Sequence, residues 1–392
     1  MTDTGPPSPS PRALILVTAA GLTLMAVVGV WFLRRSAGVE SRSANDRGAG
    51  VGALYVGEAS CRKCHPAESA LHQKSGHALT LQPVAERDEL LRWLDGRKAG
   101  DPEYPEAAFT FHVRDGRLNV ERSAPGEESW STPIGFAFGS GHHATTFVTM
   151  GEPIANGTAG IEHRLTYFAT DRRLAVTPGQ DAVSNVELAR KTPRGRLLNA
   201  SQARKCFDCH TTRVSDRDPK TLDLATMIPN VSCERCHGPG KAHVEAAGRG
   251  ETRLKMPGGP SRSTAATEVR LCGHCHRLPE MAPPGAIRSG NTELVRFQPV
   301  GLLQSKCYKQ SDGALSCTTC HDPHARASDD STTYNAVCLK CHQAPPQTVC
   351  GVGRGDRCID CHMPRRDAGQ KILFADHWIR VHPQAPTTVE TR

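Results

Sequence analysis

The chain has 392 residues and a formal net charge of +8, and only 5% of its residues are aromatic and 38% hydrophobic. With 36 glycines and 28 prolines as well, this composition excludes a chain that fills the cores of two or three ordinary domains with side chains alone. Cofactors are expected to supply the missing apolar volume.

An uncharged apolar segment covers residues 13–33, ALILVTAAGLTLMAVVGVWFL. Its 21 residues are enough to cross a bilayer as a helix. Arg34 and Arg35 follow directly, where a cleaved signal peptide would have a small-residue cleavage site, and this favours an uncleaved anchor over a cleaved signal. The sequence therefore predicts a cytoplasmic N-terminus (1–12), a transmembrane anchor (13–33) and a flexible tether rich in Ser, Gly and Ala (34–53).

A Cys-x-x-Cys-His pattern occurs seven times, and it uses fourteen of the sixteen cysteines. Two thiols one helical turn apart can bond to the two vinyl groups of one porphyrin, and the next imidazole can then bind its iron. A zinc site needs a closed set of four ligands, which gives no reason for a histidine directly after every second cysteine. The sequence therefore predicts seven covalently bound haem c groups.

Each motif supplies two attachment cysteines and one proximal iron ligand, and we name each motif by its first cysteine. The predicted attachment cysteines are Cys61, Cys64, Cys206, Cys209, Cys233, Cys236, Cys272, Cys275, Cys317, Cys320, Cys338, Cys341, Cys358 and Cys361. The predicted proximal ligands are His65, His210, His237, His276, His321, His342 and His362.

Covalent haem attachment of this kind takes place on the outer side of the bacterial inner membrane. The sequence therefore predicts a single-pass inner-membrane protein whose haem domain, residues 54–392, lies in the periplasm. The positive charge does not indicate a nucleic-acid partner, because each ferric haem with two ionised propionates adds about −1. Basic residues are expected to face propionates and solvent.

One motif precedes and six follow a haem-free stretch, residues 81–203. In FTFHVRDGRLNVER the apolar residues alternate on both sides of Asp115-Gly116, which is a hairpin signature. Residues 164–176 have the pattern of a second hairpin. The predicted fold is therefore a mainly α and irregular multihaem cytochrome c fold with a haem-packed core and a small β-hairpin insert, preceded by the transmembrane helix.

Several short segments resemble one family. HGPGKAH from His237, HDPH from His321, CHMPR from Cys361 and DHWIRVH from Asp376 are similar to segments of multihaem c-type cytochromes. This family is typified by the tetrahaem electron acceptor of hydroxylamine oxidoreductase (the cytochrome c five-five-four group). SGHA and GSGHHATTF, from Gly139, fit the same family.

The resemblance implies a set of distal iron ligands. They are His77, His243, His324, His377 and one of the pair His142 and His143, with His143 as the candidate. Seven motifs in place of four leave open which distal histidine serves which haem. Two imidazoles on one iron favour a low reduction potential.

Cys307 and Cys350 remain outside the seven motifs. In an oxidising compartment a disulfide is the ordinary state of two such cysteines. A cysteine thiolate as a haem ligand is the alternative.

Two functional classes fit these features. The first is an electron carrier that passes electrons between a membrane or enzyme donor and a periplasmic acceptor, with redox proteins or a quinone-linked membrane complex as partners. The second is an oxidoreductase that acts on a small nitrogen or sulfur compound, such as nitrite, hydroxylamine or tetrathionate, at one haem with an open position. The sequence favours the carrier, because the histidines suffice for every axial position and no acid or base cluster stands out beside one motif.

Overall fold

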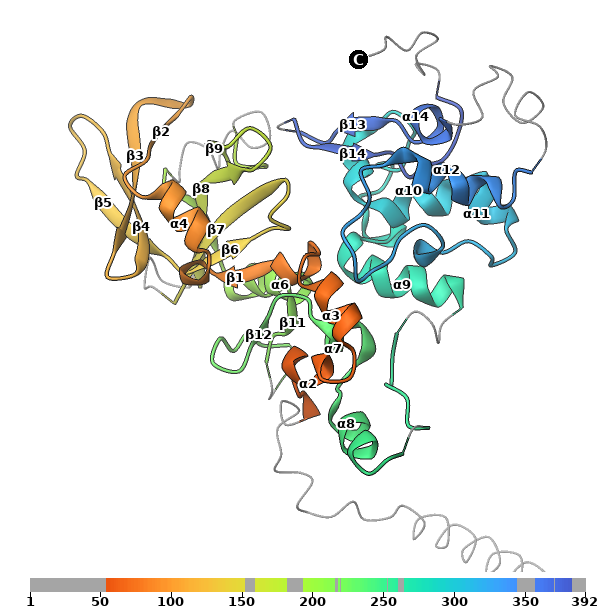
Figure 1. Ribbon diagram of the computed structural model, residues 1–392. Helices are drawn as coiled ribbons and strands as arrows, with labels where there is room; N and C mark the ends of the chain where they lie inside the picture. Colours follow the sequence, from red (N-terminus) through yellow and green to blue (C-terminus); the bar gives the residue numbers. More distant parts are fainter. Residues whose placement is uncertain are drawn as a thin grey trace, which may run out of the picture. The chain divides into compact units, whose positions relative to one another are not determined.

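The computed structural model describes residues 54–151, 159–181, 193–215, 218, 220–251, 253–259, 264–343, 357–369 and 371–382 (Figure 1). Among these residues no helix is both long enough and apolar enough to cross a membrane. The structure therefore does not support the predicted single-pass anchor and inner-membrane location. The segments on which that prediction was placed, 13–33 and the tether 34–53, lie outside the described residues.

A four-stranded antiparallel sheet contains the first predicted hairpin. Its strands, in spatial order, are β2 (Lys98–Asp101), β3 (Tyr104–Arg114), β4 (Arg117–Ser123) and β5 (Trp130–Ile134). Arg114 pairs with Arg117 across the β3–β4 turn. Asp115 and Gly116 both have positive φ angles, 51° and 70°, which is the backbone of a type I′ turn. The hairpin prediction is confirmed here.

A larger antiparallel sheet follows along the chain. It has the order β1 (Leu81–Pro83), β6 (Phe136–Phe138), β7 (Ala144–Met150), β8 (Gly160–Phe168) and β10 (Gly195–Leu198), and β9 (Arg173–Val176) also pairs with β8. The β8–β9 pair, in which Leu165 lies opposite Val176, is the second predicted hairpin.

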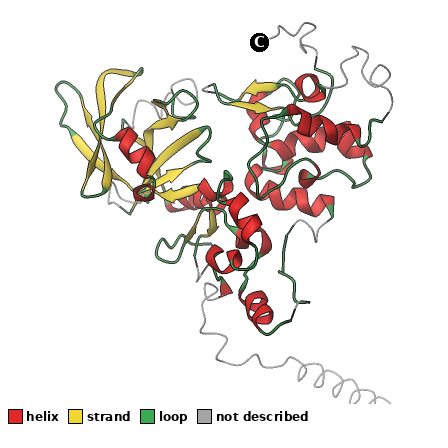
Figure 2. Cartoon of the chain, viewed as in Figure 1, coloured by secondary structure: helices red, strands yellow, loops and turns green. Residues whose placement is uncertain are grey.

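The predicted fold class is therefore wrong, because the chain is a mixed α and β protein and not a mainly helical one with a small hairpin (Figure 2). Seven of the nine residues of β8 are buried, so both of its faces are covered. Of this larger sheet only the β8–β9 pair was predicted from the sequence. Strands β1, β6 and β10 have only three or four residues, which is too short to show a pattern.

The two sheets have a side-chain core of their own. It contains buried residues of β3, β4, β5, β6, β7 and β8, among them Phe109, Phe111, Leu118 and Phe147. Helix α4 (Asp88–Leu94) adds Leu90 and Leu94 to this core and contacts β3 (Figure 1).

The remaining described segments consist of short helices and two small β-pairs. The α-helices are α2 (Glu58–Arg62), α3 (Pro66–His72), α6 (Ala200–His210), α7 (Cys233–His237), α8 (Lys241–Gly248), α9 (Ala265–His276), α10 (Gln298–Gln304), α11 (Lys306–Gln310), α12 (Ser331–Leu339) and α14 (Cys358–His362). The 3₁₀ helices are η3 (His77–Leu79), η4 (Val84–Glu86), η6 (Pro279–Met281), η7 (Thr292–Arg296) and η8 (Cys317–Thr319). Strand β11 (Thr211–Arg213) pairs with β12 (Ile228–Pro229), and β13 (Arg365–Asp367) pairs with β14 (Leu373–Ala375).

Candidate haem centres

Every Cys-x-x-Cys-His motif lies on or beside a short helical turn. In the Cys61 motif, the N–H groups of Cys64 and His65 both donate to the Cys61 carbonyl, at 3.1 and 2.9 Å. The Cys317 and Cys338 motifs make the same two bonds. Residues three apart in a helical turn lie on one face, so each motif presents its two thiols on the same side.

Four pairs of imidazole rings face one another at nearly the same spacing. The ring centres are 6.4 Å apart for His65 and His243, 6.3 Å for His77 and His276, 6.1 Å for His237 and His324, and 6.2 Å for His321 and His377. Each pair joins a proximal histidine of one motif to a histidine from a distant segment.

This spacing fits one metal ion between two rings. Two metal–nitrogen bonds of about 2 Å on opposite sides of a metal separate the nitrogens by about 4 Å, and each ring centre lies about 1 Å further out. The result is close to the four observed distances. The residues present therefore fit a haem iron held by two axial imidazoles.

Hydrogen bonds at Nδ1 orient these rings. The Nδ1 atoms of His77, His243 and His377 lie 3.2, 2.8 and 2.9 Å from the carbonyl oxygens of Pro323, Leu254 and Ala375, and that of His324 lies 3.0 Å from the Asp322 carboxylate. A carbonyl or carboxylate at Nδ1 fixes the proton there and leaves Nε2 free for a metal.

Other histidines use Nε2 for hydrogen bonds and so lack this arrangement. The Nε2 atom of His72 lies 2.9 Å from the Val231 carbonyl, and that of His163 lies 2.8 Å from the Thr149 hydroxyl. Candidate iron ligands therefore use Nδ1 for their hydrogen bond, whereas His72 and His163 use Nε2. The sequence does not show which of the two nitrogens is bonded.

Three proximal histidines face no second imidazole at this spacing within the described residues: His210, His342 and His362. The Nδ1 atoms of His210 and His362 do have carbonyl partners, Thr80 at 2.9 Å and Arg380 at 3.1 Å. The ring of His210 instead has Phe138 as a neighbour, edge-on at 5.2 Å between centres.

The predicted distal ligand His143 is not brought to a proximal histidine. Its ring lies 5.4 Å from that of Phe374 in β14. The neighbouring His142 has a buried Nε2 atom without a hydrogen-bond partner. Burial lowers the pKa of both histidines, and Arg326 lowers it further.

Thiols of different motifs lie close together in three places. Cys61 and Cys233, Cys209 and Cys275, and Cys272 and Cys317 are near enough to shift one another's pKa, and the helices that carry them, α2 with α7, α6 with α9 and α9 with η8, are in contact. Burial raises the pKa of Cys236 and Cys338 to about 11, so these thiols are uncharged at neutral pH. No group of three His, Cys, Asp or Glu side chains in the described part of the chain is arranged to hold a zinc ion.

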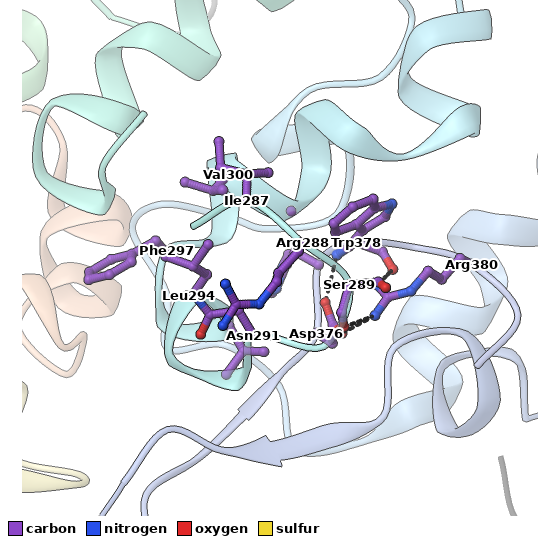
Figure 3. Close-up of a pocket in the computed structure, with 13 residues that line it drawn as sticks. Ile287, Arg288, Ser289, Asn291, Leu294, Phe297, Val300, Asp376, Trp378 and Arg380 are labelled. Atoms are coloured by element: carbon purple, nitrogen blue, oxygen red, sulfur yellow. Dashed lines mark hydrogen bonds and ion pairs between the residues drawn. The ribbon is translucent and has the colours of Figure 1, made fainter. Parts of the chain in front are cut away.

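The DHWIR segment that carries His377 is held in place by polar contacts (Figure 3). The Arg380 guanidinium donates to the carbonyls of Trp378 and Ser289, at 2.7 and 3.0 Å, and to Asp376 at 3.1 Å. Gly301 lets α10 approach this segment, because a Cβ atom there would lie 2.5 Å from the Trp378 nitrogen. These contacts orient His377 toward His321.

The predicted Cys307–Cys350 disulfide stays a prediction. Cys350 lies outside the described residues. Cys307 lies in α11 close enough to Cys320 and Cys341 to interact with both electrostatically.

Comparisons with known proteins indicate the family of multihaem c-type cytochromes. Residues 179–238 match the family of cytochrome c554 and c-prime, and residues 311–346 match the doubled CXXCH motif. The dissimilatory sulfite reductase MccA of Wolinella succinogenes is 21% identical over 388 residues, which cover 79% of this chain and 50% of that protein. The chain thus spans about half the length of this relative. The crystal structure of the outer cell wall cytochrome OcwA has a TM-score of 0.47 and 15% identity, over 83% of this chain and 80% of that one.

Proposed function

We propose that this chain, which belongs to the multihaem c-type cytochromes, is an electron carrier that holds seven covalently bound haems. The observation that supports a carrier most directly is the set of four opposed imidazole pairs. Bound haem supplies an iron that alternates between the ferric and ferrous states and so takes up or releases one electron. An iron held on both sides by imidazole has no position left for a substrate.

The pairs support a proposal for the ligands of four haems. His243 would serve the Cys61 motif, His324 the Cys233 motif, His77 the Cys272 motif and His377 the Cys317 motif. Two imidazoles stabilise ferric iron, so these centres are expected to have low reduction potentials.

Contacts between motifs suggest the order of the haems. Helix α2, which carries Cys61, contacts α7, which carries Cys233, and α9, which carries Cys272, contacts η8, which carries Cys317. Cys236 interacts electrostatically with Cys272, as Cys338 does with Cys320 and Cys358.

These contacts make a continuous row of motifs from Cys61 through Cys233, Cys272, Cys317 and Cys338 to Cys358. The Cys206 motif joins the row from the side, because α6 contacts α9 and the Cys209 thiol donates to the His274 carbonyl of the Cys272 motif, at 3.8 Å. The electron donors and acceptors at the ends of this row are proposed to be redox proteins or a quinone-linked complex.

Two measurements on the purified holoprotein test the carrier. Its intact mass should exceed that of the polypeptide by seven haem masses. Its ferric EPR spectrum should contain the low-spin signals of the four imidazole pairs, and carbon monoxide should leave these four haems unchanged after reduction. A mass with three or four haems, or a zinc ion in their place, would overturn the proposal.

A second function is an oxidoreductase that acts at the Cys206 motif. It is favoured by His210, which faces no second imidazole within the described residues and has Phe138 beside it. The relative MccA is a dissimilatory sulfite reductase, which makes sulfite the first substrate to test, with nitrite and hydroxylamine after it. A high-spin haem signal that shifts on addition of one of these compounds, and turnover of that compound, would establish the enzyme over the carrier.

A further inference from the structure

Some of the variable residues between the two cysteines of a motif bond to other parts of the chain. In three places a hydrogen bond links one motif to a neighbouring motif. The bonding residue lies either between the two cysteines or on the segment that leads into the motif. We infer that Glu234, Glu268 and the pair Asp208–His274 are positioning residues that hold neighbouring haem-attachment loops together and lower the reduction potentials of the haems bound there.

Glu234 lies between the cysteines of the Cys233 motif and is only 2% exposed. Its carboxylate accepts bonds from the backbone N–H groups of Val56 at 3.0 Å, Gly57 at 2.9 Å and Gly240 at 2.8 Å. Val56 and Gly57 lead directly into α2, which carries Cys61. The carboxylate therefore joins the Cys61 and Cys233 motifs.

Glu268 plays the same part for a second pair of motifs. It lies on α9, which ends in the Cys272 motif, and it is 4% exposed. Its carboxylate accepts bonds from the backbone N–H and the hydroxyl of Thr318, at 2.7 and 2.9 Å. Thr318 lies between the cysteines of the Cys317 motif.

The third contact joins two variable residues. Asp208 of the Cys206 motif lies 3.2 Å from Nε2 of His274, which belongs to the Cys272 motif. Arg235 of the Cys233 motif also donates to the Asp208 carbonyl, at 2.7 Å.

These three contacts coincide with the three thiol contacts. Cys61 with Cys233, Cys272 with Cys317, and Cys209 with Cys275 are the same pairs of motifs. A bond that spans two loops beside each thiol contact limits how far the loops can separate. Each carboxylate thus keeps two attachment loops side by side.

The carboxyl oxygens of Glu234 and Glu268 accept their bonds from backbone N–H groups and from the Thr318 hydroxyl, and a carboxylate is suited to this set of donors because it only accepts. A buried negative charge favours the ferric state of a nearby haem over the ferrous state, and therefore lowers its potential.

The inference rests on the proposed haem attachment, and three variants test it in the full-length holoprotein. Glu234→Gln should raise the potentials of the haems on the Cys61 and Cys233 motifs only. Glu268→Gln should raise those on the Cys272 and Cys317 motifs. Asp208→Asn should raise those on the Cys206 and Cys272 motifs, so that the Cys272 haem responds twice. Spectroelectrochemical titration gives the potentials, and His243→Ala, His324→Ala, His77→Ala and His377→Ala assign the signals.

Glu245→Gln is the matched control, since Glu245 lies on α8 with an exposed side chain. It should shift no potential. Asp208 is less buried than the two glutamates, at 27% exposure of its side chain, so Asp208→Asn keeps the test available if a glutamine variant fails to mature.

The outcomes separate this inference from the proposed function. A full haem count with unshifted potentials, or with the same haems shifted in all three variants, would overturn the inference alone. A reduced haem count in the unmodified protein would overturn the proposed function.

Discussion

Two regions of this chain build their interiors in different ways. The β region, residues 81–198, holds both large sheets and fills its core with side chains such as Phe111, Phe147 and Leu165. The haem-attachment region, residues 54–80 and 200–382, has helices of five to twelve residues. It has fewer buried apolar side chains. Ala203, Phe207 and Val214 pack against the larger sheet, and others, such as Val269 and Val300, lie outside both hydrophobic clusters.

The contrast shows where the apolar volume missing from the composition belongs. In the β region packed apolar side chains stabilise the fold, as they do in an ordinary domain. Isolated helices of five to twelve residues are unstable in water. The haem-attachment region therefore depends on its cofactors for a core.

The buried polar side chains of the two regions also differ in their hydrogen-bond partners. In the β region the buried Arg164 guanidinium bonds to Asp101, to Glu103 at 2.7 Å and to the Gln180 carbonyl, so it completes a closed set of partners. In the haem-attachment region the buried polar contacts run between motifs, as at Glu234 and Glu268.

The largest expected effect comes from withholding haem. The full chain, produced without haem attachment, should lose amide protection throughout α7 to α14 and keep it in β3, β4, β7 and β8. Hydrogen exchange read by mass spectrometry checks this, with the mature protein as the control. Protection of α9 in the haem-free chain would show that the haem-attachment region has a sufficient core of its own.

A substitution in the core of the β region should destabilise that region and leave the haem-attachment region unaffected. Phe147 is fully buried, and its ring lies 6.0 Å from that of Phe111. Phe147→Ala should lower the free energy of unfolding of the β region by about 3–5 kcal/mol while the haem spectrum stays unchanged. Denaturant titrations followed by far-UV circular dichroism and by haem absorbance measure the two effects separately.

The control for that substitution is Leu224→Ala, at a side chain that is 39% exposed, which should have a small effect on unfolding. Loss of low-spin haem signals in Phe147→Ala would mean that the two regions are not independent in stability.

Removing one distal histidine should change one haem and little else. His377→Ala leaves His321 as the single imidazole at its centre, so one haem should become high-spin and bind carbon monoxide after reduction. His112→Ala, at a β3 histidine beside Glu121, should leave every haem signal intact. EPR spectra of both variants decide the matter, and an unchanged spectrum in His377→Ala would remove the ligand assignment.

The smallest effect concerns pH and the β region. Burial lowers the pKa of His163 from 6.5 to about 3, so the folded state holds this ring neutral. Below pH 6.5 this histidine is protonated in the unfolded chain and stays neutral in the folded chain. Its contribution to the free energy of unfolding is therefore fully present above pH 6.5, and it falls as the pH drops toward 3, by at most about 1.4 kcal/mol per pH unit.

Urea unfolding of the β region at pH 7, 6 and 5 measures this slope. His163→Gln cannot titrate, so its slope should be smaller than that of the unmodified protein. Equal slopes in the two proteins would assign the acid sensitivity to other groups.

Sequence alone determined the features that depend on neighbours along the chain. The spacing within each motif predicts a haem c and its proximal histidine, because both thiols and the imidazole lie within one helical turn. Asp115-Gly116 predicts its hairpin, because the turn needs two residues that accept positive φ angles. The resemblance to the cytochrome family also picked out His77, His243, His324 and His377, without their partners.

Only the tertiary structure decided how distant segments meet. His65 faces His243 and His321 faces His377 because separate helices and loops pack together, and no local spacing encodes that packing. Strand β8 also pairs with β7 and β10, and only its pairing with β9 follows from a local hairpin pattern. Glu234 reaches Val56 across 178 positions of the chain, which makes its role a property of the folded chain and not of the motif that contains it.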